Sequence, residues 1–346
     1  MDWLWTASAG GRFPPPVDVV ALATAAAITF AACWPLRQLA LHFEILDRPG
    51  RHKAHAKPVP YLGGVAIWMG TLGALTIFDL HQTWIPALFA VLVALGIADD
   101  LLTIGVASRL FVQVSLAVAA VGLGAVWHIT DSTALNAIVS VVWIVGLTNS
   151  LNLLDNMDGL ASTVGATGLL VVAFIDPGQA TFQLALAGAL IGFLFVNMPP
   201  ARMYMGDAGS LMVGFGLAVA TISAANHARG LHSLVLIVGP VAVAVFDTML
   251  VITSRIMSGR PIQLGGRDHF SHRLQLQGWS PELVLAASAG GAAAAGFAAY
   301  LASTYPVTTA WLALPLAAAG ASAWWWLLKI DPYTNARPAV VDAFSA

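Results

Sequence analysis

Long apolar stretches separated by short polar ones dominate this chain. A bilayer asks for about 20 apolar residues per spanning helix. Eleven segments approach or reach that length, at about 17–41, 62–79, 84–98, 106–127, 136–153, 160–175, 180–196, 210–226, 232–254, 281–302 and 307–328. Because helices are the only open-chain structures that satisfy the backbone within lipid, the pattern predicts an all-α polytopic membrane protein with about 11 transmembrane helices.

Polar and acidic residues gather in the loops after the first, third, fifth, seventh and ninth segments. Helix counting places these loops on one membrane face, and of the 15 Lys and Arg residues only Arg12 and Arg229 lie on the other. Cytoplasmic loops carry the excess of Lys and Arg, so this face is predicted to be cytoplasmic, with the N-terminus outside and the C-terminus inside. The loops of this single membrane domain, residues 1–346, are about 42–61, 99–109, 149–160, 197–210 and 255–280.

Composition supports the membrane class and excludes others. Hydrophobic residues make up 58% of the chain and charged residues only 9%, against about 25% charged in soluble domains. The net charge of −2 says nothing about nucleic acid, but no basic stripe exists to bind it, so no nucleic-acid partner is expected. A single cysteine, Cys33, excludes disulfides and a cysteine-based metal site. No basic segment precedes the first apolar run, so we expect no cleaved signal peptide.

Asp99 and Asp100 form the first cluster with candidate chemistry. They end the third segment, where the helix dipole prefers cations, and adjacent carboxylates repel each other. A divalent metal or a nearby cation relieves both problems, and paired carboxylates commonly hold Mg²⁺ against substrate phosphates. Arg109 and Gln113 open the next segment and suggest a basic partner for phosphate. The alternative is a solvated carboxylate pair at the membrane interface.

The densest polar run extends from Asn149 to Gly159. Asn149, Asn152 and Asp155 follow one another at i, i+3 spacing, so they share one helical face. Asp155 to Asp158 then enter a tight turn closed by Gly159, but the glycine and glutamate of a calcium-binding EF-hand are misplaced. Amides and acids at a membrane edge favour a functional role.

The loop after the seventh segment combines glycines with polar groups. Gly206 and Gly209 permit a close approach of the backbone, and Asp207 would lie just ahead of a helix N-terminus that attracts anions. A simple helix cap is the alternative. The nearby Asn197 and Arg202 favour a corner for metal and phosphate instead.

His269 and His272 lie three residues apart, with Arg273 beside the second. A zinc site needs further ligands, so phosphate recognition by histidine and arginine is favoured. The first loop adds Lys53 and His55, for which a loop that is basic only because it faces the cytoplasm is the alternative.

Asp247 lies within the ninth apolar segment. An acid inside the membrane is a functional candidate by default. Its place near the cytoplasmic end, two turns before Arg255, favours a structural polar contact.

Five motifs, taken in order, resemble those of the polyprenyl-phosphate N-acetylhexosamine-1-phosphate transferases, which include phospho-N-acetylmuramoyl-pentapeptide transferase. They run from about residue 47 to residue 274: Asp-Arg-Pro…Arg-His-Lys-Ala-His…Pro-Val-Pro…Gly-Gly, Ala-Asp-Asp, Asn-Leu-Leu-Asp-Asn-Met-Asp-Gly-Leu, Met-Gly-Asp-Ala-Gly-Ser and His-Phe-Ser-His-Arg-Leu. The resemblance implies transfer of a sugar-1-phosphate from a UDP-sugar to a polyprenyl phosphate such as undecaprenyl phosphate, with release of UMP. It implies a requirement for Mg²⁺, with Mn²⁺ as a substitute.

The resemblance also implies a place for the protein in the cell. It indicates a multi-pass protein of the inner (plasma) membrane with a cytoplasmic active site. The reaction would be the first membrane step in the synthesis of a cell-wall or surface polysaccharide, such as lipopolysaccharide or teichoic acid. Whether two copies of the chain form a homodimer is left open.

Roles for single residues follow from the same resemblance. Asp99 would be the base or nucleophile, and Asp100 would assist it. Asp207 would bind Mg²⁺ with Asn152 and Asp100, and His269 would join Asp99, Asp100 and Asp207 in the catalytic group. The residues implied in substrate binding are Lys53, His55, Arg109, Asn149, Asp155, Asp158, Asn197, Arg202, His272 and Arg273.

The first-loop pattern is more similar to the UDP-GlcNAc branch than to the pentapeptide branch. The chain departs from the usual patterns at His52, at Arg109 where lysine is frequent, and at Asn156 where glycine is common. It also has two histidines in the last motif where relatives often have three, which leaves the hexosamine open. A one-step attack and an aspartyl-phosphate intermediate on Asp99 are both compatible with the residues.

A membrane transporter or flippase for a nucleotide-sugar or a lipid-linked sugar is the alternative function. Transporters place their substrate sites near the bilayer midplane, within repeated halves. In this chain the polar residues lie at one edge and no repeat is visible, so the enzyme is favoured.

Overall fold

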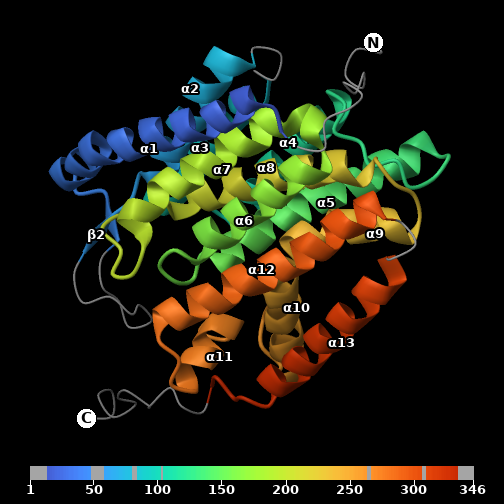
Figure 1. Ribbon diagram of the computed structural model, residues 1–346. Helices are drawn as coiled ribbons and strands as arrows, with labels where there is room; N and C mark the ends of the chain where they lie inside the picture. Colours follow the sequence, from blue (N-terminus) through green and yellow to red (C-terminus); the bar gives the residue numbers. More distant parts are fainter. Residues whose placement is uncertain are drawn as a thin grey trace, which may run out of the picture.

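The computed structural model describes residues 14–47, 58–79, 84–102, 104–262, 266–305 and 309–333. Helices make up almost all of it (Figure 1). The first seven are α1 (Pro16–His42), α2 (Gly63–Phe78), α3 (Trp84–Leu102), α4 (Val106–Gly122), α5 (Thr133–Leu154), α6 (Leu160–Ile175) and α7 (Ala180–Asn197). The others are α8 (Gly206–Ala225), α9 (Leu231–Val238), α10 (Ala242–Met257), α11 (Phe270–Leu276), α12 (Pro281–Thr304) and α13 (Thr309–Leu328). Two 3₁₀ turns, η3 (Pro177–Gln179) and η4 (Gly239–Val241), precede α7 and α10.

The helices confirm an all-α polytopic membrane protein. Within the described residues, eight helical stretches are long and apolar enough to cross a membrane. The three shorter apolar helices, α2, α4 and α6, coincide with three further predicted segments. The number of eleven crossings and the orientation of the termini stay predictions.

The ninth apolar segment is not one continuous helix. It divides into α9 and α10, with η4 between them. Pro240 lies in this break, and proline has no N–H to continue a helix. The hydropathy pattern is blind to such a break, because Gly239 and Pro240 lie within an otherwise apolar run.

Helix α8 forms the centre of the bundle, and 94% of its most apolar stretch is buried. It packs against α3 and α5, which carry the polar clusters at their ends. The approach to α3 is so close that a Cβ at Gly96 would lie 2.1 Å from the backbone nitrogen of Ala208. A Cβ at Gly214 would lie 2.7 Å from the Cα of Thr148 in α5. Small residues are the usual means by which membrane helices approach closely, and here they bring three polar helix ends together.

The start of α2 is fastened to the start of α8. Strand β2 (Val59–Pro60) pairs antiparallel with β1 (Leu46–Asp47) at the two ends of the first loop. The backbone N–H of Tyr204 donates to the carbonyl of Pro60 at 2.9 Å, and the N–H of Gly63 donates to the carbonyl of Tyr204 at 3.0 Å. The polar loop ahead of α8 therefore lies beside the end of the first loop.

Candidate active site

Arg109 joins two of the three carboxylates proposed as catalytic. Its Nη1 donates to Oδ2 of Asp99 at 2.7 Å and lies 3.4 Å from Oδ2 of Asp207. The other oxygen of Asp99 accepts from the backbone N–H of Ile104 at 2.8 Å. The cation expected beside the acidic end of α3 is therefore Arg109, which approaches from the first turn of α4.

Asp207 lies in the first turn of α8 and receives the amide of Asn152. The Asn152 Nδ2 donates to Oδ1 of Asp207 at 2.8 Å and to the Ser210 hydroxyl at 2.9 Å. Asp100 adjoins the same turn, since a Cβ at Gly206 would lie 2.5 Å from its Oδ2. Gly206 also has a φ of +65°, which favours glycine. The predicted cluster of Asp99, Asp100, Asp207, Asn152 and Arg109 is thus one site at the meeting of α3, α4, α5 and α8.

Two buried donors near this cluster have no partner among the described residues. They are Nε of Arg109 and Nε2 of Gln113. Gln113 lies one helical turn after Arg109, and its Oε1 accepts from Nδ2 of Asn149 at 2.7 Å. An unpaired buried donor is unfavourable by about 1–3 kcal/mol. The two donors make this side of the site suited to an anionic ligand such as a phosphate.

The acidic site has an unbalanced negative charge. Burial raises the pKa of the Asp155 carboxyl to about 8, and nearby carboxylates add to the shift: Asp207, Asp100 and Asp158. Burial also raises the pKa of the Tyr61 hydroxyl, with Asp100 and Asp207 contributing. Carboxylates raise one another's pKa in this way when a compensating cation is lacking.

The turn between α5 and α6 is held against the loop that precedes α8. Asp158 Oδ2 accepts from the backbone N–H of Ala201 at 2.8 Å. The Asn197 side chain, 2% exposed, accepts from the N–H of Gly159 at 3.1 Å and donates to the carbonyl of Met203 at 3.0 Å. Asn197 was expected to bind substrate, but here both of its polar atoms have partners and brace these two loops.

The histidines of the last motif are held by α10 and not by the helices of the acidic site. Asp247 of α10 is fully buried, and its Oδ2 lies 2.7 Å from Nδ1 of His269. His272 packs beside His269, with their ring centroids 5.7 Å apart. Burial lowers the pKa of His272 to about 4, with His269 and Arg267 adding to the shift. Without a bound substrate, His272 is therefore neutral at pH 7 and offers its ring nitrogens for hydrogen bonds.

Arg273 does not face a ligand in this structure. It is fully buried, and its Nη1 donates to the backbone carbonyls of Leu327 at 2.9 Å and Ile330 at 2.5 Å. Its Nη2 donates to the Ser254 hydroxyl at 2.6 Å. Arg273, expected to bind substrate, thus connects α11 to the end of α13.

Three of the predicted site residues remain to be placed. Arg202 is exposed on the loop between α7 and α8. Lys53 and His55 lie outside the described residues.

The histidine group connects to the acidic site through the turn after α5, since the Ser271 hydroxyl donates to Oδ1 of Asn156 at 2.5 Å.

Three residues that support the histidines, Asp268, Arg255 and Tyr333, were not among the predicted site residues. Asp268 forms a buried ion pair with Arg255 at 2.7 and 2.9 Å, and accepts from the Tyr333 hydroxyl at 2.9 Å. Burial alone would raise the pKa of Asp268, but these hydrogen bonds lower it below its usual value. The structural contact expected for Asp247 is present, yet its partner is His269 and not Arg255. No sequence signal indicates Tyr333, whereas the intramembrane position of Asp247 was a signal of function.

The carboxylate oxygens of Asp100 and Asp207 are ligands that a hard cation such as Mg²⁺ prefers, whereas Asn152 donates its amide nitrogen to Asp207 and would have to turn its amide oxygen toward the ion to join them. In the part of the chain that the structure describes, no three His, Cys, Asp or Glu side chains are grouped to hold a metal. The site is therefore not a preformed all-protein cage. Mg²⁺ is often bound by one or two carboxylates together with substrate phosphates, and this set is of that kind.

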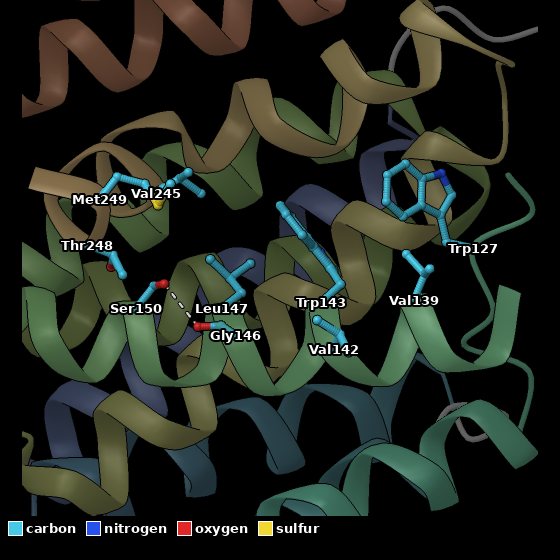
Figure 2. Close-up of a pocket in the computed structure, with 10 residues that line it drawn as sticks. All are labelled: Trp127, Val139, Val142, Trp143, Gly146, Leu147, Ser150, Val245, Thr248 and Met249. Atoms are coloured by element: carbon cyan, nitrogen blue, oxygen red, sulfur yellow. Dashed lines mark hydrogen bonds between the residues drawn. The ribbon is translucent and has the colours of Figure 1, made fainter. Parts of the chain in front are cut away.

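An apolar cavity of about 270 Å³ opens along α5 (Figure 2). Trp143, Leu147 and Ser150 of α5 line one side, and Val245 and Met249 of α10 line the other. The α5 lining runs from Val139 to Ser150, a rise of about 16 Å along the helix. Its Ser150 end is next in sequence to Asn149 and two residues before Asn152 of the acidic site. An apolar cavity therefore runs along the helix that carries the polar site at its end.

Comparison with known proteins places the chain in a family. The profile of Glycosyl transferase family 4 matches residues 83–225, which contain the acidic site. A "putative glycosyltransferase" of Streptomyces coelicolor is 33% identical over 87% of this chain and 74% of its own length. A probable undecaprenyl-phosphate N-acetylglucosaminyl 1-phosphate transferase of Bacillus subtilis is 29% identical, over 71% of this chain and 74% of the relative.

A decaprenyl-phosphate N-acetylglucosaminephosphotransferase of Mycobacterium tuberculosis is 28% identical, with 76% of each chain covered. The names of these last two relatives agree with the branch that the first-loop pattern indicated. The prediction of the family is thereby confirmed. The chain belongs to glycosyl transferase family 4, among the relatives of polyprenyl-phosphate N-acetylglucosamine-1-phosphate transferases.

Proposed function

We propose that this protein transfers N-acetylglucosamine-1-phosphate from UDP-GlcNAc to a polyprenyl phosphate, with release of UMP. An oxygen of the lipid phosphate attacks the sugar-linked phosphorus and forms a new P–O bond. The bond from that phosphorus to the bridging oxygen breaks, and UMP leaves with the electron pair. The observation that carries the proposal is the single cluster in which Arg109 and Asn152 contact Asp207 beside Asp99 and Asp100.

The chemical difficulty of this reaction is charge. Two anionic phosphates must meet, so the site has to neutralise them and hold them in line. Arg109 has an unpaired buried Nε as well as its contact to Asp99, and it is suited to a phosphate oxygen. Asp99 lies beside it as the base that takes the proton of the lipid phosphate or as the nucleophile that attacks first.

Mg²⁺, or Mn²⁺ in its place, is part of the proposal. Asp207, Asp100 and Asn152 would hold the cation together with the substrate phosphates. Bound there, it supplies charge stabilisation of the reacting phosphates. Burial is the main cause of the raised pKa of Asp155, but Asp207, Asp100 and Asp158 add to it, and this gathering of carboxylates supports a cation at this place.

The apolar cavity suits the acceptor. A polyprenyl chain is apolar and its phosphate is ionic, so its site must join lipid to a polar edge. The cavity between α5 and α10 supplies the apolar part, and the polar end of α5 supplies the other. We therefore assign the start of the lipid chain to this cavity, with the phosphate toward Asn149 and Asn152.

Cellular placement follows from the same chemistry. UDP-sugars are made in the cytoplasm, so the active site would lie on the cytoplasmic face of the inner membrane. The product, a lipid-linked sugar, would begin the synthesis of a cell-wall or surface polysaccharide. Nothing in the proposal requires a second copy of the chain.

Release of UMP by the purified protein tests the function. The detergent-solubilised chain is given undecaprenyl phosphate, Mg²⁺ and, in separate reactions, UDP-GlcNAc, UDP-GalNAc or UDP-MurNAc-pentapeptide. We expect UMP from UDP-GlcNAc only when lipid and metal are both present. Turnover with another donor would correct the sugar. No UMP from any donor, in protein that elutes as a single folded species, would contradict the transferase and favour a transporter.

A further inference from the structure

Asp247 is a carboxylate in an unusual position. It lies in α10 with 0% of its surface exposed, within a stretch apolar enough to span a membrane. Burying an ionised carboxylate is costly unless it is paired and hydrogen-bonded. The nearest arginine along the helix, Arg255, forms a two-pronged ion pair with Asp268 instead. Asp247 therefore depends on other partners.

Those partners are two atoms at the start of α11. Oδ2 of Asp247 is 2.7 Å from Nδ1 of His269, and Oδ1 accepts from the backbone N–H of Phe270 at 2.8 Å. Since a carboxylate at this distance accepts a hydrogen bond, Nδ1 carries the hydrogen. The second ring nitrogen of His269, Nε2, is then the ring atom left for another contact, in a residue that is only 4% exposed. The two bonds together fix the ring and the backbone that follows it.

Among the described residues, Asp247 is the only side chain that forms a hydrogen bond with the His269 ring. His272 lies beside the ring, and its buried Nδ1 has no partner. Asp268 is taken by Arg255 and Tyr333, and Arg273 is bound to carbonyls at the end of α13. Neither His272, Asp268 nor Arg273 forms a hydrogen bond with the His269 ring. The tautomer of His269 is therefore set by one side chain.

We propose that Asp247 is a positioning residue for the transfer reaction. It acts by holding His269 as the Nδ1–H tautomer, so that Nε2 is presented to the UDP-sugar as a hydrogen-bond acceptor for a hydroxyl. This assignment rests on the proposed function, because it takes His269 to be in contact with the donor substrate. The buried contact itself does not depend on that function.

Replacement of Asp247 by asparagine should switch the tautomer of the His269 ring. The asparagine oxygen still accepts from Phe270 N–H, and its amide then donates to Nδ1, which moves the ring hydrogen to Nε2. In the Ser-His-Asp triad of serine proteases, where the histidine is the general base, the same Asp→Asn change lowers kcat by about 10⁴. We expect Asp247→Asn to lower kcat/KM for the UDP-sugar by about 100-fold or more, with little change in the KM for polyprenyl phosphate.

A double-mutant cycle separates positioning from mere stability. Asp247→Asn, His269→Ala and the double variant are compared in the full-length protein. If Asp247 acts through the ring, adding Asp247→Asn to His269→Ala should lower the rate by less than about twofold. A second full loss in the double variant, or parent-like turnover of Asp247→Asn, would overturn the proposal.

The chain supplies a matched control in a second Asp–His pair. His227 Nε2 lies 3.0 Å from Asp176, which is 3% exposed, in the turns that follow α8 and α6. These turns are at the opposite ends of α6 and α8 from the polar site. Asp176→Asn removes a comparable contact, and we expect parent-like kcat/KM from it.

Nitrogen-15 NMR of histidine-labelled protein in lipid nanodiscs gives a readout that needs no turnover. His269 is assigned by the signal missing from His269→Ala. We expect Nδ1–H in the parent and Nε2–H in Asp247→Asn. An Nε2–H tautomer in the parent would overturn the inference. Should the parent release no UMP, the proposed function fails, whereas this measurement still decides the tautomer.

Discussion

At the residue scale, the site depends on one cation placed between carboxylates. Arg109 contacts Asp99 at 2.7 Å and Asp207 at 3.4 Å, so it relieves the repulsion expected at the acidic end of α3. Both contacts are only partly buried, which leaves the cluster open to ligands. Asn152 also donates its amide N–H to Asp207, so this carboxylate is held by Arg109 on one oxygen and by Asn152 on the other.

Asp99→Asn tests the catalytic role proposed for Asp99. The amide oxygen can still accept from Ile104 N–H, but the amide nitrogen cannot accept from Arg109, so the charge and the ion pair with Arg109 are both lost. We expect kcat to fall by about 100-fold or more, the range of a lost acid–base group. Asp131→Asn, an exposed acid in the loop before α5, is the control and should behave as the parent. Turnover near the parent value in folded Asp99→Asn would exclude a catalytic role.

Asn197→Ala should act on stability. Its removal leaves Gly159 N–H and the Met203 carbonyl without partners in a buried place. Each unsatisfied group is unfavourable by about 1–3 kcal/mol, so we expect a clearly lower unfolding temperature in a detergent melt. The activity that remains should show a nearly unchanged KM for the UDP-sugar. A raised KM with an unchanged melt would instead place Asn197 at the substrate.

At the element scale, the short helix α11 depends on its neighbours. Its first turn is held by Asp247 of α10, and its Arg273 is held by the end of α13. Helix α13 lies at the edge of the bundle beside α12 (Figure 1). The end of a peripheral helix thus supports the histidine loop.

Arg273→Met and Arg202→Met separate support from binding. Arg273 is fully buried on carbonyls, whereas Arg202 is exposed. We expect Arg273→Met to lower the unfolding temperature by several degrees, because it leaves buried acceptors unpaired. Arg202→Met should leave the melt unchanged and raise the KM for the UDP-sugar several-fold. The reverse pattern would show that the two roles are exchanged.

The pair of His227 and Asp176 gives a pH dependence of stability. The hydrogen bond that Asp176 accepts from His227 raises the pKa of His227 above its ordinary 6.5. A raised folded-state pKa contributes stability that is fully present below pH 6.5 and is lost as pH rises through the higher folded value. We therefore expect the melting temperature to decline more steeply above pH 6.5 in the parent than in His227→Gln. Identical pH profiles of the two proteins would contradict this.

The sequence predicted the elements well but not their breaks. The apolar segments of the sequence coincide with helices because the thickness of the membrane sets the length of both. The division of α9 from α10 and the existence of α11 were not predicted, since Gly239–Pro240 is apolar and Phe270–Leu276 is polar. Short helices are set by tertiary contacts, such as that of Asp247 with Phe270 N–H, which no local pattern records.

At the scale of the whole molecule, loops far apart in sequence form one site. The motifs identified Asp99, Asp207, Asn152 and Arg109, and the structure brings them together, because matching helix ends return to one face of the bundle. The motifs did not reveal that Asn197 and Arg273 have partners within the protein. A motif shows where polar residues are required, but they can be required either to bind substrate or to hold two parts of the protein together.

The fate of the β-phosphate tests the central claim most directly. UDP-GlcNAc labelled with ³²P at the β-phosphate and with ¹⁴C in the sugar is incubated with the purified protein, Mg²⁺ and undecaprenyl phosphate. If the protein transfers a sugar-1-phosphate, both labels enter the lipid extract in equal amounts and UMP remains in water. Sugar label in the lipid without ³²P, accompanied by UDP, would show simple glycosyl transfer and contradict the proposed reaction.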